Sequence, residues 1–145
     1  MLKASAQTMC EDIEFYFQQL SVNCKNISGK LIPAVKEHAT TKVIAGMDHG
    51  QCSGTQAYTN DFVKFYSKKF DTPAAADSLY QTFKKQLTDC AVADGYIIQS
   101  QAVLDEADKI IRWNKTINKQ NKTIVLELKP APDGGFLVTL EFILS

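Results

Sequence analysis

The stretch Phe136-Leu-Val-Thr-Leu-Glu-Phe-Ile-Leu144 decides the fold class. Its alternate positions are apolar, and the polar residues Thr139 and Glu141 fall between them. These alternate apolar positions are Phe136, Val138, Leu140, Phe142 and Leu144. Successive side chains of a β-strand point to opposite faces, so this alternation predicts a strand with one buried face. The C-terminal end of the chain is therefore expected to belong to a sheet that covers a core on one side.

The residues before this strand repeat the same pattern. Ile124, Leu126 and Leu128 alternate with polar residues, and residues 130–135 supply Pro, Asp and Gly for a turn. Further upstream, residues 100–112 fit either a helix capped by Ser100 or part of two strands at 96–104 and 109–117. We prefer the two strands, which continue into a turn at 118–121. The C-terminal third is thus predicted to be an antiparallel meander.

Helical patterns come first in the chain. Cys10, Ile13, Phe17, Leu20 and Cys24 recur at three-and-four spacing, which predicts a helix from Met9 onward. Three further helices are expected to follow. The second would begin at Pro33, carry Val35, Val43, Ile44 and Met47, and end near Gly46. The third would be capped by Thr59 or Asn60 and bury Phe62, Val63, Tyr66 and Phe70. The fourth would begin at Thr72-Pro73 and run through Leu79, Phe83, Leu87 and Cys90 to about Ala93.

These elements predict one soluble α+β domain spanning residues 1–145, with N-terminal helices packed on a C-terminal meander that forms a curved sheet or a cone. The 145 residues are 45% hydrophobic and 22% charged, as in ordinary globular domains. Sixteen basic side chains balance sixteen acidic ones, and Arg112 is the only arginine, so nucleic acid is not an expected partner. No apolar run approaches the roughly 20 residues that a membrane-spanning helix needs.

Four cysteines form an even set, which is typical of disulfides in an oxidising compartment. A helix over residues 9–22 would separate Cys10 from Cys24 by about 20 Å, too far for a bridge. We expect Cys10–Cys90 and Cys24–Cys52; the crossed pairing of the same four residues is the alternative. Asn26, Asn114 and Asn121 begin glycosylation sequons, and Ala4-Ser5-Ala6 is typical of the end of a signal peptide. A secreted or periplasmic location is the resulting prediction.

The expected order is helices followed by a four-stranded meander. In it, Asp108-Lys-Ile-Ile-Arg-Trp-Asn114 forms a charged turn that leads into a strand with an inward tryptophan. Over residues 72–144 this pattern resembles the nuclear-transport-factor-like (SnoaL-type) fold. The resemblance implies a sheet curled over helices, whose interior takes steroids, polyketides, peptides or no ligand. Tyr16, Tyr66, Phe83 and Trp113 are then either core residues or the lining of a pocket.

A second segment, Lys42-Val-Ile-Ala-Gly46, is similar to the Gln-x-Val-x-Gly hairpin loop of cystatins, although it continues the expected second helix. That similarity implies protease inhibition.

No motif in the sequence predicts catalysis, a metal or a cofactor. His49 and Cys52 have the spacing of a zinc pair, but no second tight pair accompanies them. Our leading hypothesis is a secreted, non-enzymatic binding protein that holds an apolar small molecule or a protein partner. One alternative is a small SnoaL-type isomerase, cyclase or hydrolase that uses His38 or His49 with Asp48. Another is an envelope or immunity-type protein that acts by docking a partner.

Overall fold

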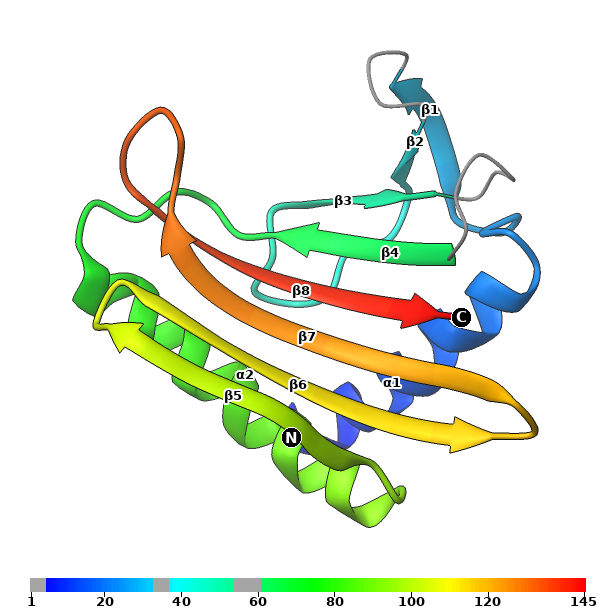
Figure 1. Cartoon of the computed structure of the whole chain (residues 1–145). Coiled ribbons are helices and arrows are strands. Elements are labelled where there is room, and N and C mark those ends of the chain that lie inside the picture. Colours follow the sequence, from blue (N-terminus) through cyan, green and yellow to red (C-terminus); the bar gives the residue numbers. More distant parts are fainter. Residues whose placement is uncertain (1–4, 33–36, 54–60) are drawn as a thin grey trace.

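The computed structural model describes residues 5–32, 37–53 and 61–145. Over these residues the chain forms two helices and eight strands. In chain order they are α1 (Ser5–Ser21), β1 (Ser28–Ile32), β2 (Glu37–Thr40), β3 (His49–Cys52), β4 (Asp61–Tyr66), α2 (Pro73–Ala93), β5 (Ile97–Asp105), β6 (Asp108–Ile117), β7 (Gln120–Pro130) and β8 (Phe136–Leu144). The strands form one open, curved antiparallel sheet in the order β1-β2-β3-β4-β8-β7-β6-β5, and both helices lie on the same side of it (Figure 1). The α+β class with a curved sheet is as predicted.

The predicted meander forms β5 to β8. The stretch of ambiguous pattern folds as two strands, and Asp105 pairs with Asp108 at the turn between them. Asn118 and Lys119 have φ of 51° and 67°, so they form the two-residue turn that joins β6 to β7. Side chains on the helix side of the sheet stack across the strands, as where Trp113 pairs with Ile124 and Ile124 with Phe142. The core of the protein lies between this side of the sheet and the helices.

A capping residue begins α2, and residues with positive φ follow the ends of both helices. Thr72 is extended, and its Oγ1 accepts a hydrogen bond from the Ala75 N–H at 3.2 Å, so it caps α2. Gly95 ends this helix at φ +87°, which places the Tyr96 N–H on the Ala91 carbonyl. In α1, residues at helical spacing from Met9 to Leu20 are buried, and the helix stops where Asn23 and Cys24 adopt positive φ. The first and fourth predicted helices are therefore present.

The second and third predicted helices are wrong. Thr72-Pro73 begins the second helix of the structure, while Glu37–Thr40, His49–Cys52 and Asp61–Tyr66 are strands that extend the sheet beyond the predicted meander. Pro33, Val35, Thr59 and Asn60, on which the two expected helices partly depended, lie outside the described residues. Strand β4 pairs along its whole length with β8, and Val63 and Phe65 are fully buried by this pairing and by the helices. Tertiary pairing thus outweighs a local pattern that fits either period.

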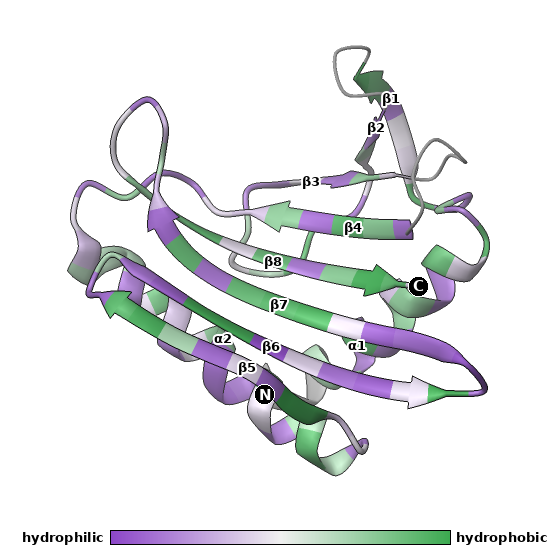
Figure 2. Ribbon diagram, in the orientation of Figure 1, coloured by the Kyte–Doolittle hydropathy of each residue, from purple (hydrophilic) through white to green (hydrophobic). Residues whose placement is uncertain are grey.

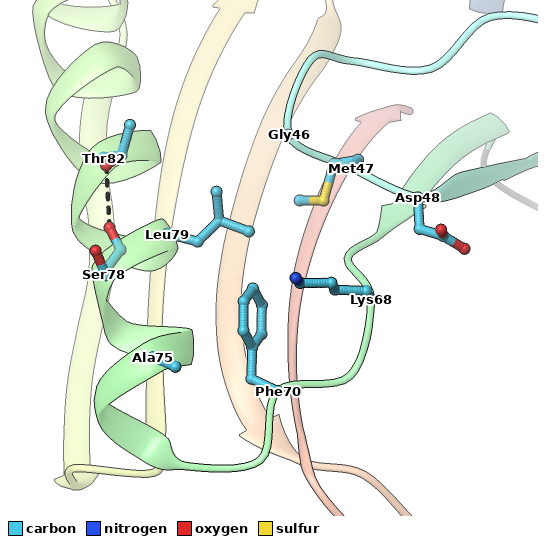
Figure 3. Close-up of a pocket in the computed structure, with 9 residues that line it drawn as sticks. All are labelled: Gly46, Met47, Asp48, Lys68, Phe70, Ala75, Ser78, Leu79 and Thr82. Carbon is cyan, nitrogen blue, oxygen red and sulfur yellow. Dashed lines mark hydrogen bonds between the residues drawn. The ribbon is translucent and has the colours of Figure 1, made fainter.

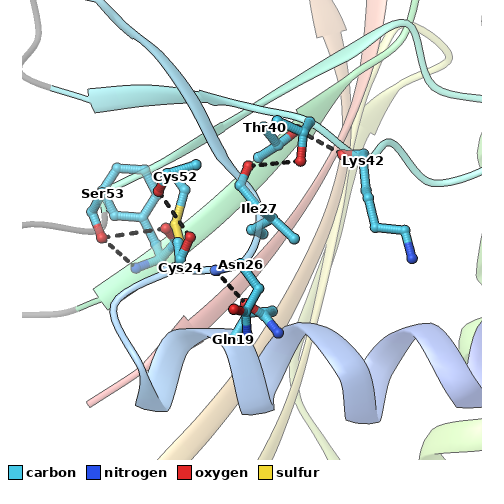
Figure 4. The surroundings of a disulfide bond; sticks show 11 residues. Gln19, Cys24, Asn26, Ile27, Thr40, Lys42, Cys52 and Ser53 are labelled. Carbon is cyan, nitrogen blue, oxygen red and sulfur yellow. Dashed lines mark hydrogen bonds between the residues drawn. A yellow bond between two sulfur atoms is a disulfide. The ribbon is translucent and has the colours of Figure 1, made fainter.

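Each half of the chain has the same order, a helix followed by four strands, and the halves meet where β4 pairs with β8. Two disulfides reinforce this arrangement. Cys10–Cys90 joins α1 to α2 with 5.2 Å between Cα atoms, and Cys24–Cys52 joins the turn after α1 to β3 with 6.6 Å between Cα atoms (Figure 4). These are the two pairs that the sequence predicts. Such bridges fit a protein of an oxidising compartment.

Candidate binding surface

One side of the sheet is not covered by either helix, and we call it the open face. The strand registers define two adjacent rows of side chains on it. The first row is Lys64, Glu141, Val125 and Arg112, and the second is His49, Tyr66, Thr139, Glu127 and Ile110. Hydrophilic and hydrophobic residues alternate along these strands, because each strand turns its apolar positions mainly toward the helices (Figure 2). The open face therefore carries a band of charged, aromatic and aliphatic groups.

The centre of the open face is shielded from solvent although no helix lies above it. Val125 is 6% exposed and Thr139 is 2% exposed. Both residues lie between longer side chains of neighbouring strands, including Glu141 and Glu127. A carboxyl group in such surroundings is partly desolvated. The open face thus has a partly dry centre with charges of both signs around it.

Burial dominates the electrostatics of Glu141. It raises the pKa of this carboxyl, and the nearby charges of Glu127 and Glu37 act in the same direction, while Lys64 and Arg112 oppose them. Burial, followed by Glu37 and Glu141, also raises the pKa of the Tyr66 hydroxyl. The phenol therefore remains protonated at neutral pH and can donate a hydrogen bond. Its position, 3.5 Å from Gln51 Oε1, places this donor at the edge of the charged band.

Aromatic stacking orders one end of the open face. The rings of His49 and Tyr66 stack with their centroids 5.0 Å apart and an angle of 11° between planes. On the other side of His49, its Nδ1 lies 3.1 Å from Asp48 Oδ2, and both side chains are more than half exposed. The second histidine, His38, pairs with Cys52, three residues from His49 along β3, and so lies on the opposite side of the sheet. The two histidines do not share a site.

The four aromatic residues proposed as binding residues separate into two groups. Tyr16, Phe83 and Trp113 are at most 2% exposed and lie in the core, where the Tyr16 ring packs 4.8 Å from Phe65 between centroids. Within the described part of the chain, Trp113 Nε1 is buried without a hydrogen-bond partner. Tyr66 alone of the four lies on the open face. Lys64 Nζ lies 5.5 Å from its ring centroid.

A cleft of about 360 Å³ lies on the other side of the sheet, between α2 and the ends of β3 and β4 (Figure 3). Met47, Phe70 and Leu79 give it an apolar floor. The Lys68 ammonium points into the cleft, 5.5 Å from the centroid of the Phe70 ring, whereas the Asp48 carboxylate points away. The pattern of the sequence did not indicate this cleft, because its lining comes from three separate segments.

The segment that is similar to the cystatin loop connects β2 to β3 and is not the tail of a helix. Ile44 is 3% exposed and anchors the segment in the core. Gly46, at φ +97°, packs close to the side chains of Phe83 and Leu79, and Lys42 Nζ lies 4.7 Å from the centroid of the Phe15 ring. Ile44 and Gly46 therefore hold the segment against the core, while Val43 is 40% exposed.

The three sequons lie at the surface or near it. Asn26 is exposed in the turn after α1. The other two sequons face each other across the β6–β7 hairpin: Asn114 Nδ2 donates to Thr123 Oγ1 at 3.1 Å, and Thr116 Oγ1 donates to Asn121 Oδ1 at 2.6 Å. Each sequon asparagine thus contacts the threonine of the other sequon. This reciprocal pair lies at one end of the open face.

Within residues 5–32, 37–53 and 61–145, no group of three or more His, Cys, Asp or Glu side chains could hold a metal ion. Neither helix of that part of the chain is long and apolar enough to cross a membrane. No family model matches the chain, and no curated protein matches its sequence at a significant level.

Proposed function

We propose that this chain is a secreted, non-enzymatic binding protein whose open face docks a protein partner. One observation carries the proposal: a sheet face without a covering helix brings together Tyr66, the half-buried carboxyl of Glu141 and Arg112, the only arginine of the chain. Tyr and Arg are among the residue types that most often dominate binding energy at protein interfaces. The two disulfides support the secreted part of the proposal.

The extent and charge of the open face favour a protein over an apolar small molecule. Small-molecule sites are concave and mostly apolar, whereas a protein interface has an apolar centre and a polar rim. Here Val125 and Thr139 form a nearly buried centre, Tyr66 and Ile110 lie to either side of it, and the charges of Lys64, Glu127 and Arg112 surround it. Three of the four aromatic residues that could have lined a cavity instead fill the core.

The order of charges on the open face defines the chemistry of the partner. Arg112 presents a planar guanidinium that binds carboxylates in a bidentate manner. Glu141, two strands away in the same row, accepts hydrogen bonds and attracts a cation. The partner surface therefore carries an Asp or Glu opposite Arg112, a Lys or Arg opposite Glu141, and an apolar side chain against Tyr66.

Affinity capture with matched variants tests the proposal. The wild-type protein, a Tyr66→Ala/Arg112→Ala variant and the control Lys85→Ala are immobilised and exposed to the secreted fraction of the source. Lys85 is a strongly exposed residue of α2, away from the open face. We expect one partner to bind the wild type and the control and to bind the double variant about 30-fold or more weakly, as for loss of a hot spot. Equal capture by all three proteins would contradict the proposal, provided that circular dichroism shows the variants folded.

A second candidate rests on the cleft of Figure 3. Its apolar floor with one inward ammonium suits an apolar molecule that carries an acidic group, bound with the acid against Lys68. Native mass spectrometry of protein from its own source would show a bound acid that Lys68→Ala removes. Retention of that ligand by the variant would exclude this cleft as its site.

A further inference from the structure

Strand β5 is the most exposed element of the sheet. All nine of its residues are exposed. They include large apolar side chains with exposed fractions of 66% for Ile97, 50% for Ile98, 62% for Val103 and 75% for Leu104. Solvent exposure of so many apolar side chains on one strand is costly, and contiguous exposed apolar surface marks interaction sites.

The position of β5 adds a second feature. It is the last strand of the sheet, so one side of its backbone presents N–H and C=O groups that no strand of the sheet pairs. Natural edge strands usually carry lysine, proline or inward charges that prevent pairing. Between Ile97 and Asp105, the only charge is Asp105 at the end, and proline is absent. The opposite edge, β1, has five residues and carries Lys30.

The order of residues in β5 favours pairing with itself. Apolar pairs stand at both ends, Ile97-Ile98 and Val103-Leu104, around a more polar centre, as Figure 2 shows along the strand. An antiparallel copy centred on Gln101 places Ile98 of one chain opposite Leu104 of the other, with Ile97 and Val103 next to them in their own strands. The same arrangement keeps the two Asp105 carboxylates at opposite ends, so like charges do not meet.

Neither helix packs mainly on β5. Helices α1 and α2 make most of their contacts with the sheet at β4, β7 and β8. Register shifts occur between Ile98 and Ser100 and between Val103 and Asp105, while the stretch from Ser100 to Val103 pairs regularly with β6. A regular central stretch is the part of the strand that can form a new ladder.

We infer that β5 pairs antiparallel with β5 of a second copy of this chain, near Gln101, so that one sheet runs through both copies. The dimer buries the apolar ends of both strands and satisfies their outward backbone groups. Because the contact is one strand wide, we expect a dissociation constant in the micromolar range. This inference does not depend on the proposed function of the open face.

Sedimentation equilibrium over a range of concentrations tests the association. We expect the wild type to approach twice the chain mass of 16.1 kDa as its concentration rises. The variant Ile98→Lys/Leu104→Lys puts ammonium groups opposite each other across the contact and should weaken association about 100-fold. The matched control is Leu31→Lys, which changes a 49% exposed leucine on the opposite edge strand and should leave the dimer intact. A wild-type monomer at all concentrations, or loss of the dimer in the Leu31 variant, would overturn the inference.

A cross-link tests the register separately from the energetics. No free cysteine exists among the described residues, so Gln101→Cys introduces a single reactive thiol there. Mild oxidation should give a covalent dimer of Gln101→Cys and little of Lys85→Cys, whose thiol lies on the exposed side of α2. Similar yields for the two variants would mean that the link forms by random collision and would refute the β5 contact. Circular dichroism establishes that both variants are folded.

Discussion

Removal of the Cys10–Cys90 disulfide is the most informative perturbation of the fold. The bridge spans 80 positions of the chain, and in the chain-entropy treatment a loop of this length contributes about 4.5 kcal/mol by restricting the unfolded state. Domains of this size are commonly stable by about 5–15 kcal/mol. The variant Cys10→Ala/Cys90→Ala is therefore expected to fold with much of its stability gone. Its melting temperature should fall by about 10–15 °C.

Loss of the Cys10–Cys90 bridge should destabilise α1 more than the sheet. Without the bridge, α1 is held by the burial of Met9, Ile13, Phe17 and other core residues against α2 and the sheet. Strands β6 to β8 keep all their backbone pairing. Amide hydrogen exchange should therefore accelerate most in α1 and least in β7, as expected when one unit opens before the rest.

The assay is urea unfolding of the variant and the wild type without reductant. A matched control removes Cys24–Cys52, whose 28-position span gives about 3.5 kcal/mol in the same treatment. Both of those cysteines are fully buried, so replacing them with alanine adds a cavity cost. A loss below about 1 kcal/mol for the Cys10–Cys90 variant would refute the entropy argument. A peptide in which Cys10 is linked to Cys24 would refute the pairing itself.

Three further predictions concern single sites. Leu140→Asp should unfold the protein because it places an unpaired charge at a fully buried position. Its control Leu137→Asp, on the open side of the same strand, should leave a cooperative thermal transition. Equal melting temperatures for the two variants would refute the assignment of Leu140 to the buried face of the sheet. Burial in the folded protein raises the pKa of Glu141, so the protein loses stability as the pH rises from the ordinary pKa of 4.5 through the raised pKa. Glu141→Gln should therefore stabilise the protein at pH 7 but not below pH 4. An equal gain in the free energy of unfolding at both pH values would contradict this prediction. Secretion from a eukaryotic cell should add glycans at one or more of the three sequons, and an unchanged mass after glycosidase treatment would exclude them.

The second half of the chain could be predicted from its sequence because its signals are local. Thr72-Pro73 combines a capping hydroxyl with proline at the first helical position, and both act within one turn of the helix. In the alternation from Phe136 to Leu144, only a period of two places Phe136, Val138, Leu140, Phe142 and Leu144 on one face. The structure of these segments is determined by residues close to each other in the sequence, so it could be predicted without knowledge of the rest of the chain.

The first half could not be predicted in the same way. In β4, the apolar residues Phe62, Val63, Phe65 and Tyr66 fit a helical stripe as well as a strand. Pairing with β8 decides between them, and β8 lies about 80 positions later. The same holds for β2 and β3, which are four residues long and gain their stability from neighbours in the sheet. Local patterns of this kind are resolved only by long-range pairing.

The charged residues of the open face could not be predicted from the sequence for a related reason. Lys64, Glu141 and Arg112 come from three strands and meet only through the registers of β4, β8, β7 and β6. In an alternating strand, a polar residue between apolar ones is normally a solvated side chain, so the pattern that correctly predicts β8 also assigns Glu141 to water. The structure departs from that assignment, because the neighbouring strands desolvate this carboxyl without any helix above it. A partly desolvated charge on an uncovered sheet is a cost to folding, and a partner that pairs with Glu141 would offset it.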